Sequence, residues 1–397
     1  MQCQEMRYPY KALRSGEIRL LTIHSSSNFI LEDVCLKDDP SYIAVSYCWG
    51  LGETLCSIQV NNHEVQLRKN ICRMISTFYH KHQIRRVWVD MICIDQRNED
   101  EKSQQVAMMG EIYQRAEKVC AWIGEGDPRV ACILDILTEY RDRKILEQLP
   151  AHLDAAEQLS YQRVLFRAIY LDRAGILPSQ SDLDDTGLLE EFNWLRPLYT
   201  QPYWRRVWIV QELVLASVVI VCYEDKSIDF DEIYGLSLDW GSFDQGFDTG
   251  CYLTSKPQSR GWITIQAIRG HRQRRQKSSE VNVAAPHPIK VIMSERSDVA
   301  MLDEVIEIYA RHHECYCLKD KVYGFRELRI QWRESLIVDY TQSTKRVFLD
   351  VAKLDLLDQR KHGGIDVAFH LWEAMELGDR AEFNSCMQQH FQRLSVE

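Results

Sequence analysis

Three apolar runs, separated by two segments with helical periodicity, constrain the fold of this chain more than any other feature. The runs span residues 42–48, 86–94 and 118–124. The second run, RVWVDMICI, is apolar at nearly every position, which is typical of a strand covered on both faces. Because the links between the elements are short, this β-α-β-α-β order predicts an α/β fold, a parallel sheet wrapped by helices.

Shorter patterns complete this part of the chain. SIQVNNHEVQL, after the first run, predicts a hairpin that turns at Asn61 and Asn62. Helical spacing of apolar residues predicts one helix that begins at Asn70 and another over 98–116. Residues 18–24, IRLLTIH, predict an edge strand or a hairpin.

The length of 397 residues allows two domains, or one large domain with an elaboration. We expect an α/β domain over 1–225 with a helical insertion around 129–200, followed by a mostly helical region over 226–397. Within the first domain, residues 203–216 predict a helix that is apolar nearly all round. Residues 217–223 predict one more core strand.

Charge argues against some classes of partner. The formal net charge is −10 and the pI is near 5.7, so we expect neither a nucleic-acid binder nor a binder of anionic membranes. The basic run over 269–277 predicts a solvated helix end or loop, and a nuclear-localisation signal is the alternative. The longest apolar stretch, 207–223, contains Gln211 and Glu212, so no membrane span is expected.

The thirteen cysteines show no CxxC spacing, and most lie in apolar runs, as Cys72 does. We therefore expect free thiols, and, with no signal peptide at the start, a reducing cytoplasmic setting. HHECYC (312–317) is the one cluster of metal-binding residue types, but its spacing matches no standard zinc pattern, so no metal is predicted.

Ligands of open parallel sheets bind outside the carboxyl ends of the strands. The residues expected at this edge as a binding site are Tyr47, Trp49, Gly50, Asp90, Asp95 and Gln96. The acidic start of the next helix, which includes Glu101, is expected beside them. An aromatic surface with several carboxylates suits a nucleotide or sugar ligand.

Each of these residues also has a structural interpretation. Asp90 lies in an apolar run, where a carboxylate must accept backbone N–H groups or pair with an arginine. Trp49 could fill the core instead of offering a stacking surface. Glu101 stands three residues after Asn98, as in a capping box. Glu212 is expected to pair with one of the two arginines before it, Arg205 or Arg206.

Several long motifs resemble the fungal heterokaryon-incompatibility (HET) domain family. They are YIAVSYCWG, VWVDMICIDQRNEDEKSQQVAMMGEIYQRAEKVCAWIG and YWRRVWIVQELVLA, with YPYKALRSGEIRLLTI before them and CLKDKVYGFREL and IVDYTQSTKRVFLDVAK after them. One departure is Asp95, where the family usually has Asn, which puts any role of that amide in doubt. The resemblance implies non-self recognition and programmed cell death in filamentous fungi.

HET domains are distantly similar to Toll/interleukin receptor (TIR) domains, so the resemblance also implies a TIR-like, flavodoxin-like core. Some TIR domains hydrolyse NAD with one glutamate near a strand-end crevice. By this analogy Glu101 is the catalytic carboxylate, with Glu111 and Glu212 as second choices. NAD is then expected as a substrate, and no cofactor is expected. The alternative is a module without catalysis, which self-associates or binds an incompatibility partner.

Overall fold

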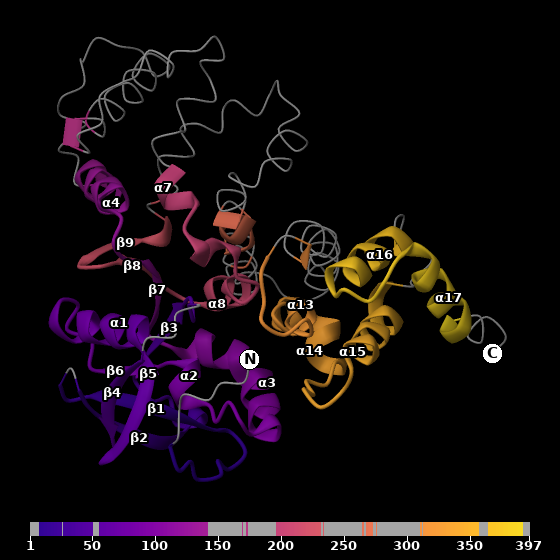
Figure 1. The fold of residues 1–397 in the computed structure, drawn as a ribbon, viewed down its shortest axis with the longest axis horizontal. Helices are drawn as coiled ribbons and strands as arrows, with labels where there is room; N and C mark the ends of the chain where they lie inside the picture. Colours follow the sequence, from indigo (N-terminus) through magenta and orange to yellow (C-terminus); the bar gives the residue numbers. More distant parts are fainter. Residues whose placement is uncertain are drawn as a thin grey trace, which may run out of the picture.

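In a computed structural model, the described residues of the chain form a nine-stranded mixed sheet covered by helices (Figure 1). The structure describes residues 8–25, 27–50, 55–141, 196–231, 313–356 and 364–391. It also describes short pieces at 169, 172–173, 233, 264–265, 267–272, 275 and 310–311. The predicted α/β fold class is confirmed.

Four neighbouring parallel strands form the centre of the sheet. They are β3 (Ile43–Tyr47), β6 (Arg86–Trp88), β7 (Lys118–Gly124) and β8 (Val219–Tyr223), in the spatial order β6-β3-β7-β8. Numbered along the chain, this order is second, first, third, fourth, as in flavodoxin-like doubly wound sheets. The chain therefore changes direction at β3, whose carboxyl end lies at the switch point.

The remaining strands make the sheet mixed rather than purely parallel. Beyond β6 lie β1 (Glu17–Ile23), β2 (Asn28–Cys35), β4 (Leu55–Val60) and β5 (His63–Arg68), and beyond β8 lies β9 (Lys226–Asp229). The hairpin prediction for 18–24 is confirmed, because β1 pairs antiparallel with β2. The alternative prediction, that residues 18–24 form an edge strand, is wrong because β1 also pairs with β6.

We predicted that the second apolar run forms one strand, and this prediction is wrong. β6 ends at Trp88, and a short helix, α2 (Asp90–Cys93), begins two residues later. The Asp90 carboxylate accepts the Met91 N–H at 2.7 Å, which satisfies a backbone donor at the start of this helix. Unbroken hydrophobicity could not reveal this change, because α2 is buried at Met91, Ile92 and Cys93.

The predicted helices flanking β6 are present. α1 (Lys69–His80) buries Ile71, Met74, Ile75 and Phe78, which have the helical spacing of apolar residues that predicted this helix. α3 (Glu99–Arg115) has Asn98 as its N-cap, with the side chain accepting the N–H groups of Asp100 and Glu101. α4 (Pro128–Arg141) follows β7.

The helix predicted over 203–216 is divided into two pieces. After α7 (Arg196–Tyr199), the chain forms a 3₁₀ turn, η5 (Pro202–Arg205), and then α8 (Ile209–Leu215). Between them Arg206 is extended, and the Val207 N–H bonds to the Glu314 carbonyl at 3.1 Å. A distant segment therefore takes the hydrogen bond that a continuous helix would have made.

The C-terminal part is helical where it is described. Its elements are α13 (Asp320–Tyr323), η9 (Arg326–Leu328), α14 (Ile330–Ser335), α15 (Thr344–Val351), η10 (Ala352–Leu356), α16 (Gly364–Ala374) and α17 (Arg380–Phe391). Figure 1 shows α13 and α14 beside α3 and α8, and α16 and α17 farther from the sheet. The predicted boundary at 225 falls in the β8–β9 turn, so the sheet extends past it. The insertion predicted around 129–200 lies mostly outside the described residues.

Two further expectations can be compared with the structure. Cys72, expected as a free thiol, forms a disulfide with Cys56 that joins α1 to β4. Cys93, Cys120 and Cys222 are buried free thiols, as expected. In the part of the chain that the structure describes, no helix is both long and apolar enough to cross a membrane.

The β4–β5 turn provides a test of local backbone strain. Asn61 and Asn62 both have positive φ, 48° and 65°, as a two-residue hairpin turn requires. We expect Asn62→Val to lower the free energy of unfolding by about 1–2 kcal/mol, because a β-branched residue fits the left-handed region poorly. Asn62→Gly should leave it equal or higher. Urea unfolding followed by circular dichroism would check this, and equal midpoints for Val and Gly would contradict it.

Candidate functional site

The Trp49–Gly50 turn after β3 has a backbone conformation that favours glycine. Gly50 has a φ of 74°, and a Cβ on it would lie 2.9 Å from the Asn70 side-chain nitrogen. That nitrogen donates to the carbonyls of Cys48 and Trp49, at 3.1 and 3.2 Å. Glycine is favoured here because its backbone is left-handed, and a Cβ would also force the Asn70 amide to shift.

Asp90 accepts hydrogen bonds from two side chains at this turn. The Tyr47 hydroxyl and the Trp49 indole N–H each donate to one of its carboxylate oxygens, at 2.9 Å. Gln96 donates to the Asp90 carbonyl at 2.9 Å. Trp49 is half-buried against the core with its N–H engaged, so it combines the core-filling role with a polar contact. Four of the predicted site residues therefore do meet at the carboxyl edge of the sheet.

A second carboxylate, Glu212, lies at the same edge. Ser46, on β3, donates to its Oε2, and the Arg206 guanidinium is 3.4 Å from that oxygen. The Tyr203 hydroxyl lies 2.6 Å from Ser46 Oγ. Because the Ser46 proton points to Glu212, Tyr203 donates to Ser46. Of the two arginines considered from the sequence, Arg206 is the partner of Glu212.

These residues form one group, which we call the carboxylate cluster: Ser46, Asp90, Tyr203, Arg206 and Glu212. Glu212 is only 1% exposed. Burial raises the pKa of Glu212, and Arg206 opposes this shift. Burial also raises the pKa of Asp90, again opposed by Arg206. The two carboxyl groups share one nearby guanidinium, so the cluster has more acid than base.

The helix that carries Glu212 is fixed at its far end by an arginine from the basic run. Arg272 donates to the carbonyls of Leu213 and Ala216, at 2.6 and 2.8 Å, and is 4% exposed. A cation at this position also complements the helix dipole. The expectation of a solvated run is therefore wrong for Arg272, which caps α8. The nuclear-localisation alternative stays a prediction.

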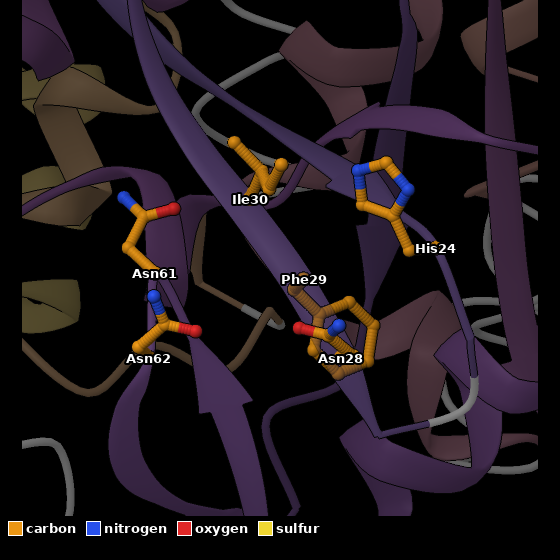
Figure 2. Close-up of a pocket in the computed structure, with 6 residues that line it drawn as sticks. All are labelled: His24, Asn28, Phe29, Ile30, Asn61 and Asn62. Atoms are coloured by element: carbon orange, nitrogen blue, oxygen red, sulfur yellow. The ribbon is translucent and has the colours of Figure 1, made fainter.

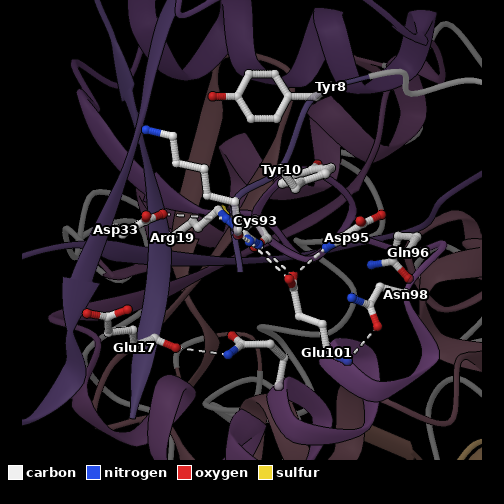
Figure 3. A network of polar contacts seen from close by, with 12 residues as sticks. Tyr8, Tyr10, Glu17, Arg19, Asp33, Cys93, Asp95, Gln96, Asn98 and Glu101 are labelled. Carbon is white, nitrogen blue, oxygen red and sulfur yellow. Dashed lines mark hydrogen bonds and ion pairs between the residues drawn. The ribbon is translucent and has the colours of Figure 1, made fainter. Parts of the chain in front are cut away.

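Glu101 belongs to a separate network, centred on Arg19 of β1 (Figure 3). The Arg19 guanidinium donates to both Glu101 oxygens, at 2.6 and 3.0 Å. The Asp95 N–H donates to Glu101 Oε1 at 2.7 Å. Arg19 is 2% and Glu101 is 7% exposed, so this is a buried two-point ion pair.

Arg19 has further acceptors in this network. It donates to the carbonyls of Cys93 and Lys11, at 3.0 and 2.6 Å, and its guanidinium lies 4.6 Å from the centre of the Tyr10 ring. The capping box predicted for Glu101 is half formed. Asn98 caps the helix, but the Glu101 carboxylate reaches Arg19 and Asp95 rather than the Asn98 N–H.

The predicted site thus divides into two groups on either side of α2. Tyr47, Trp49 and Gln96 bind Asp90, at the start of α2, and Gly50 shapes the turn. Asp95 and Glu101 lie with Arg19, which binds the carbonyl of Cys93 at the end of α2. Sequence reasoning missed the parts played by Arg19, Ser46 and Tyr203. The signal for Arg19 was a single charge in the apolar strand IRLLTI, which requires a buried partner.

A hollow of about 380 Å³ lies elsewhere on the sheet (Figure 2). Its lining residues are His24, Asn28, Phe29, Ile30, Asn61 and Asn62. Thr22 pairs with Arg86, so the β1–β2 turn lies beside the beginning of β6, whereas Asp90 follows its end. The hollow is therefore separate from the carboxylate cluster.

A doubly wound α/β domain with a buried carboxylate cluster at its switch point is the class of protein that this fold and site define. Residues 42–212 match the family described as heterokaryon incompatibility protein (HET). The matched segment runs from the residue before β3 to Glu212. Residues 42–212 of this chain are therefore similar to the HET domain.

A curated relative shows a similarity of the same kind. The chain is 27% identical over 228 residues to heterokaryon incompatibility protein 6, OR allele, of Neurospora crassa. The match covers 52% of this chain and 33% of the relative, so the chain spans about a third of the relative's length. No solved structure matches the chain. The likeness to TIR domains therefore stays a prediction.

The buried ion pair predicts a large effect on stability. We expect Glu101→Ala to lower the free energy of unfolding by about 3–5 kcal/mol, because it leaves the Arg19 charge buried without its main partner. Glu99→Ala, in the same helical turn but exposed, should change it by less than about 0.5 kcal/mol. Chemical denaturation of both variants is the measurement. Equal effects would show that the pair does not stabilise the fold.

The carboxylate cluster predicts a pH dependence. A carboxyl group whose pKa is raised on folding binds more protons in the folded state, so stability falls as pH rises through that folded pKa. The contribution of Glu212 is fully present below the unfolded carboxyl pKa of about 4.3. Glu212→Gln removes this contribution.

We therefore expect the unfolding free energy of Glu212→Gln to fall less between pH 4.5 and 7.5 than that of the wild type. Glu111→Gln is the matched control, because Glu111 pairs with Arg115 at the surface. Urea midpoints measured across this range would check the prediction. Parallel curves for wild type and Glu212→Gln would contradict it.

Proposed function

We propose that this chain acts in fungal heterokaryon incompatibility, as a HET-domain protein that signals non-self after cell fusion and leads to the death of the fused cell. The family match over 42–212 supports the role in incompatibility. The similarity to a Neurospora protein named for heterokaryon incompatibility also supports it. Cell death as the outcome comes from the family resemblance.

We favour a mechanism in which the HET domain works through protein contacts, by self-association or by binding an incompatibility partner. One observation carries this preference. Both oxygens of Glu101 are used inside the fold, by Arg19 and by the Asp95 N–H. A carboxylate that stabilises the cationic transition state of glycosidic cleavage must instead face the sugar. In this conformation Glu101 holds the structure together.

Hydrolysis of NAD is the second candidate, and the carboxylate cluster is the observation that favours it. Raised carboxyl pKa values at a strand-end edge are typical of functional sites. In this reaction water adds to the ribose C1′ as the bond to nicotinamide breaks. The pyridinium ring leaves as neutral nicotinamide, and the proton from water goes to solvent.

In such a reaction Asp90 or Glu212 could stabilise the oxocarbenium-like sugar, in place of Glu101. The Trp49 ring could hold the cationic nicotinamide before it leaves. NAD would be a substrate here rather than a resident cofactor.

Measuring nicotinamide release separates the two mechanisms. The purified full chain is incubated with NAD, and nicotinamide is followed by chromatography. The protein-contact mechanism predicts no release above buffer for wild type. Release that Glu212→Gln abolishes and Glu111→Gln preserves would establish the enzyme instead. Release lost only in a folded Glu101→Gln variant would return the catalytic role to Glu101.

The cellular role is tested separately. We expect expression of the wild-type chain in a filamentous fungus of incompatible genotype to reduce heterokaryon viability by at least tenfold. The same chain in a compatible genotype should have no effect. Viable heterokaryons across a panel of genotypes would contradict the role in incompatibility, whatever the NAD assay gives.

A further inference from the structure

Two cysteines that the candidate site does not use are bonded to each other. Cys56, near the start of β4, forms a disulfide with Cys72, in the first turn of α1. Both side chains are half-buried, and their neighbours Leu55 and Arg73 are exposed. Disulfides that solvent can reach are typically the ones that exchange with other thiols. The bond therefore lies where a small thiol can attack it.

The position of Cys72 favours its thiolate, which is the form that departs when the bond breaks. Cys72 lies at the N-terminal end of a twelve-residue helix, where the helix dipole stabilises negative charge. The first turn contains Lys69 and no acidic residue, and Arg68 is the N-cap. A thiol with a stabilised thiolate leaves a disulfide faster. Attack at Cys56 with departure of Cys72 is therefore the favoured direction of exchange.

Other cysteines of the described chain lack one or more of these properties. Burial raises the pKa of the Cys93 thiol to about 12, and burial also raises the pKa of Cys48. A thiol that keeps its proton is a poor nucleophile. Cys35 is half-buried, as the bonded pair is, but it is free. Access, a cysteine partner and a cationic helix start thus come together at the bonded pair.

Other contacts hold the two elements that the disulfide joins. β4 pairs with β5 along its whole length, from Leu55 with Arg68 to Val60 with His63. α1 is held separately, because its apolar face is buried in the core. Reduction therefore removes one link between elements that keep their remaining contacts. Both redox states are compatible with the same fold.

The disulfide lies beside the residues that hold the Trp49–Gly50 turn. Arg68 donates to the Trp49 carbonyl at 3.3 Å and also to the Gly50 carbonyl. Asn70 donates to the Trp49 carbonyl at 3.2 Å. Cys56 follows this turn along the chain, whereas its partner follows Asn70 in α1. The bond thus ties the chain that leaves the turn to the helix that holds the turn.

We propose that Cys56 and Cys72 are a reversible thiol–disulfide site for small thiols such as glutathione, and that the bond tightens the Trp49–Gly50 turn. In reduction, a glutathione thiolate attacks Cys56 Sγ, the S–S bond breaks, and Cys72 leaves as a thiolate. A second glutathione thiolate attacks the glutathione sulfur of the mixed disulfide, which releases Cys56 and forms glutathione disulfide. The two glutathione thiols supply the two electrons, and the protons they lose go to the two cysteines.

Thiol trapping in the folded wild-type chain tests the exchange. The chain is equilibrated with reduced glutathione or with glutathione disulfide, quenched in acid, alkylated in denaturant and analysed by peptide mass spectrometry. We expect both cysteines to be alkylated after reduced glutathione and joined to each other after glutathione disulfide. A bond that resists reduced glutathione until urea unfolds the chain would overturn the proposal. Failure of the bond to form in glutathione disulfide would overturn it as well.

Two variants control for the pairing. In Cys72→Ser, we expect glutathione disulfide to leave Cys56 joined to glutathione, because its partner in the chain is absent. Cys35→Ser removes a half-buried free thiol on β2 and should leave the exchange of the pair unchanged. Loss of the Cys56–Cys72 bond in Cys35→Ser would show that another cysteine takes part, contrary to the proposal.

The effect on the turn is read at the Trp49 indole N–H, which donates to Asp90 at 2.9 Å. We expect its hydrogen exchange, followed by NMR, to be about threefold faster in the reduced chain, because the turn then opens more often. Cys56→Ser should exchange at the rate of the reduced chain in either glutathione form. The Trp204 indole N–H, which donates to the Leu198 carbonyl, should not change.

Equal exchange at Trp49 in the two redox states would overturn the link between the disulfide and the turn. Neither measurement uses heterokaryon viability or NAD. The inference therefore goes beyond the proposed function, and its failure can be distinguished from the failure of that function.

Discussion

The ion pair between Arg19 and Glu101 is the interaction on which the antiparallel and the parallel parts of the sheet both depend. A guanidinium in the middle of a strand must find acceptors, because a buried charge without them is very costly. Arg19 finds them on α3, at the end of α2 and in the segment before β1. One side chain of the antiparallel part therefore ties down the crossover helix of the parallel part.

Glu101 and Glu212 show two different solutions to burying a carboxylate. Glu101 has a guanidinium bound at both oxygens and a backbone N–H as well, so its negative charge is fully compensated. Glu212 has a serine hydroxyl and a more distant guanidinium, which also lies near Asp90. The first arrangement suits a permanent structural contact. The second leaves a group whose protonation can respond to a ligand or to a movement of Arg206.

Local pattern predicted much of the fold. The strands β3, β7 and β8, the helices α1 and α3, and the Asn61–Asn62 turn follow from periodicity and turn chemistry, which neighbouring residues determine. The sequence could not show that β6 ends at Trp88, because a buried helix and a buried strand are equally apolar. It also could not show the break before α8, because the partner of Val207 lies more than a hundred residues away at Glu314.

The candidate site, like the fold, was predictable from the sequence only where local pattern determines it. Strand ends indicated that Tyr47, Trp49 and Asp90 would meet, because parallel strands deliver their carboxyl ends to one edge. The partner of Glu101 was not predictable, because an ion pair between β1 and α3 depends on where β1 enters the sheet. A charged residue in an apolar strand indicates that a partner exists but not which residue it is.

The order of the strands has a consequence for any attempt to excise the HET region. β6 is flanked by β1, and β7 is flanked by β8, yet β1 precedes residue 42 and β8 follows residue 212. A fragment cut at the family limits would keep the central strands and lose the neighbour on each side. Two rows of unpaired backbone groups would then face solvent, which favours aggregation. The region recognised by similarity is thus smaller than the unit that can close its own sheet.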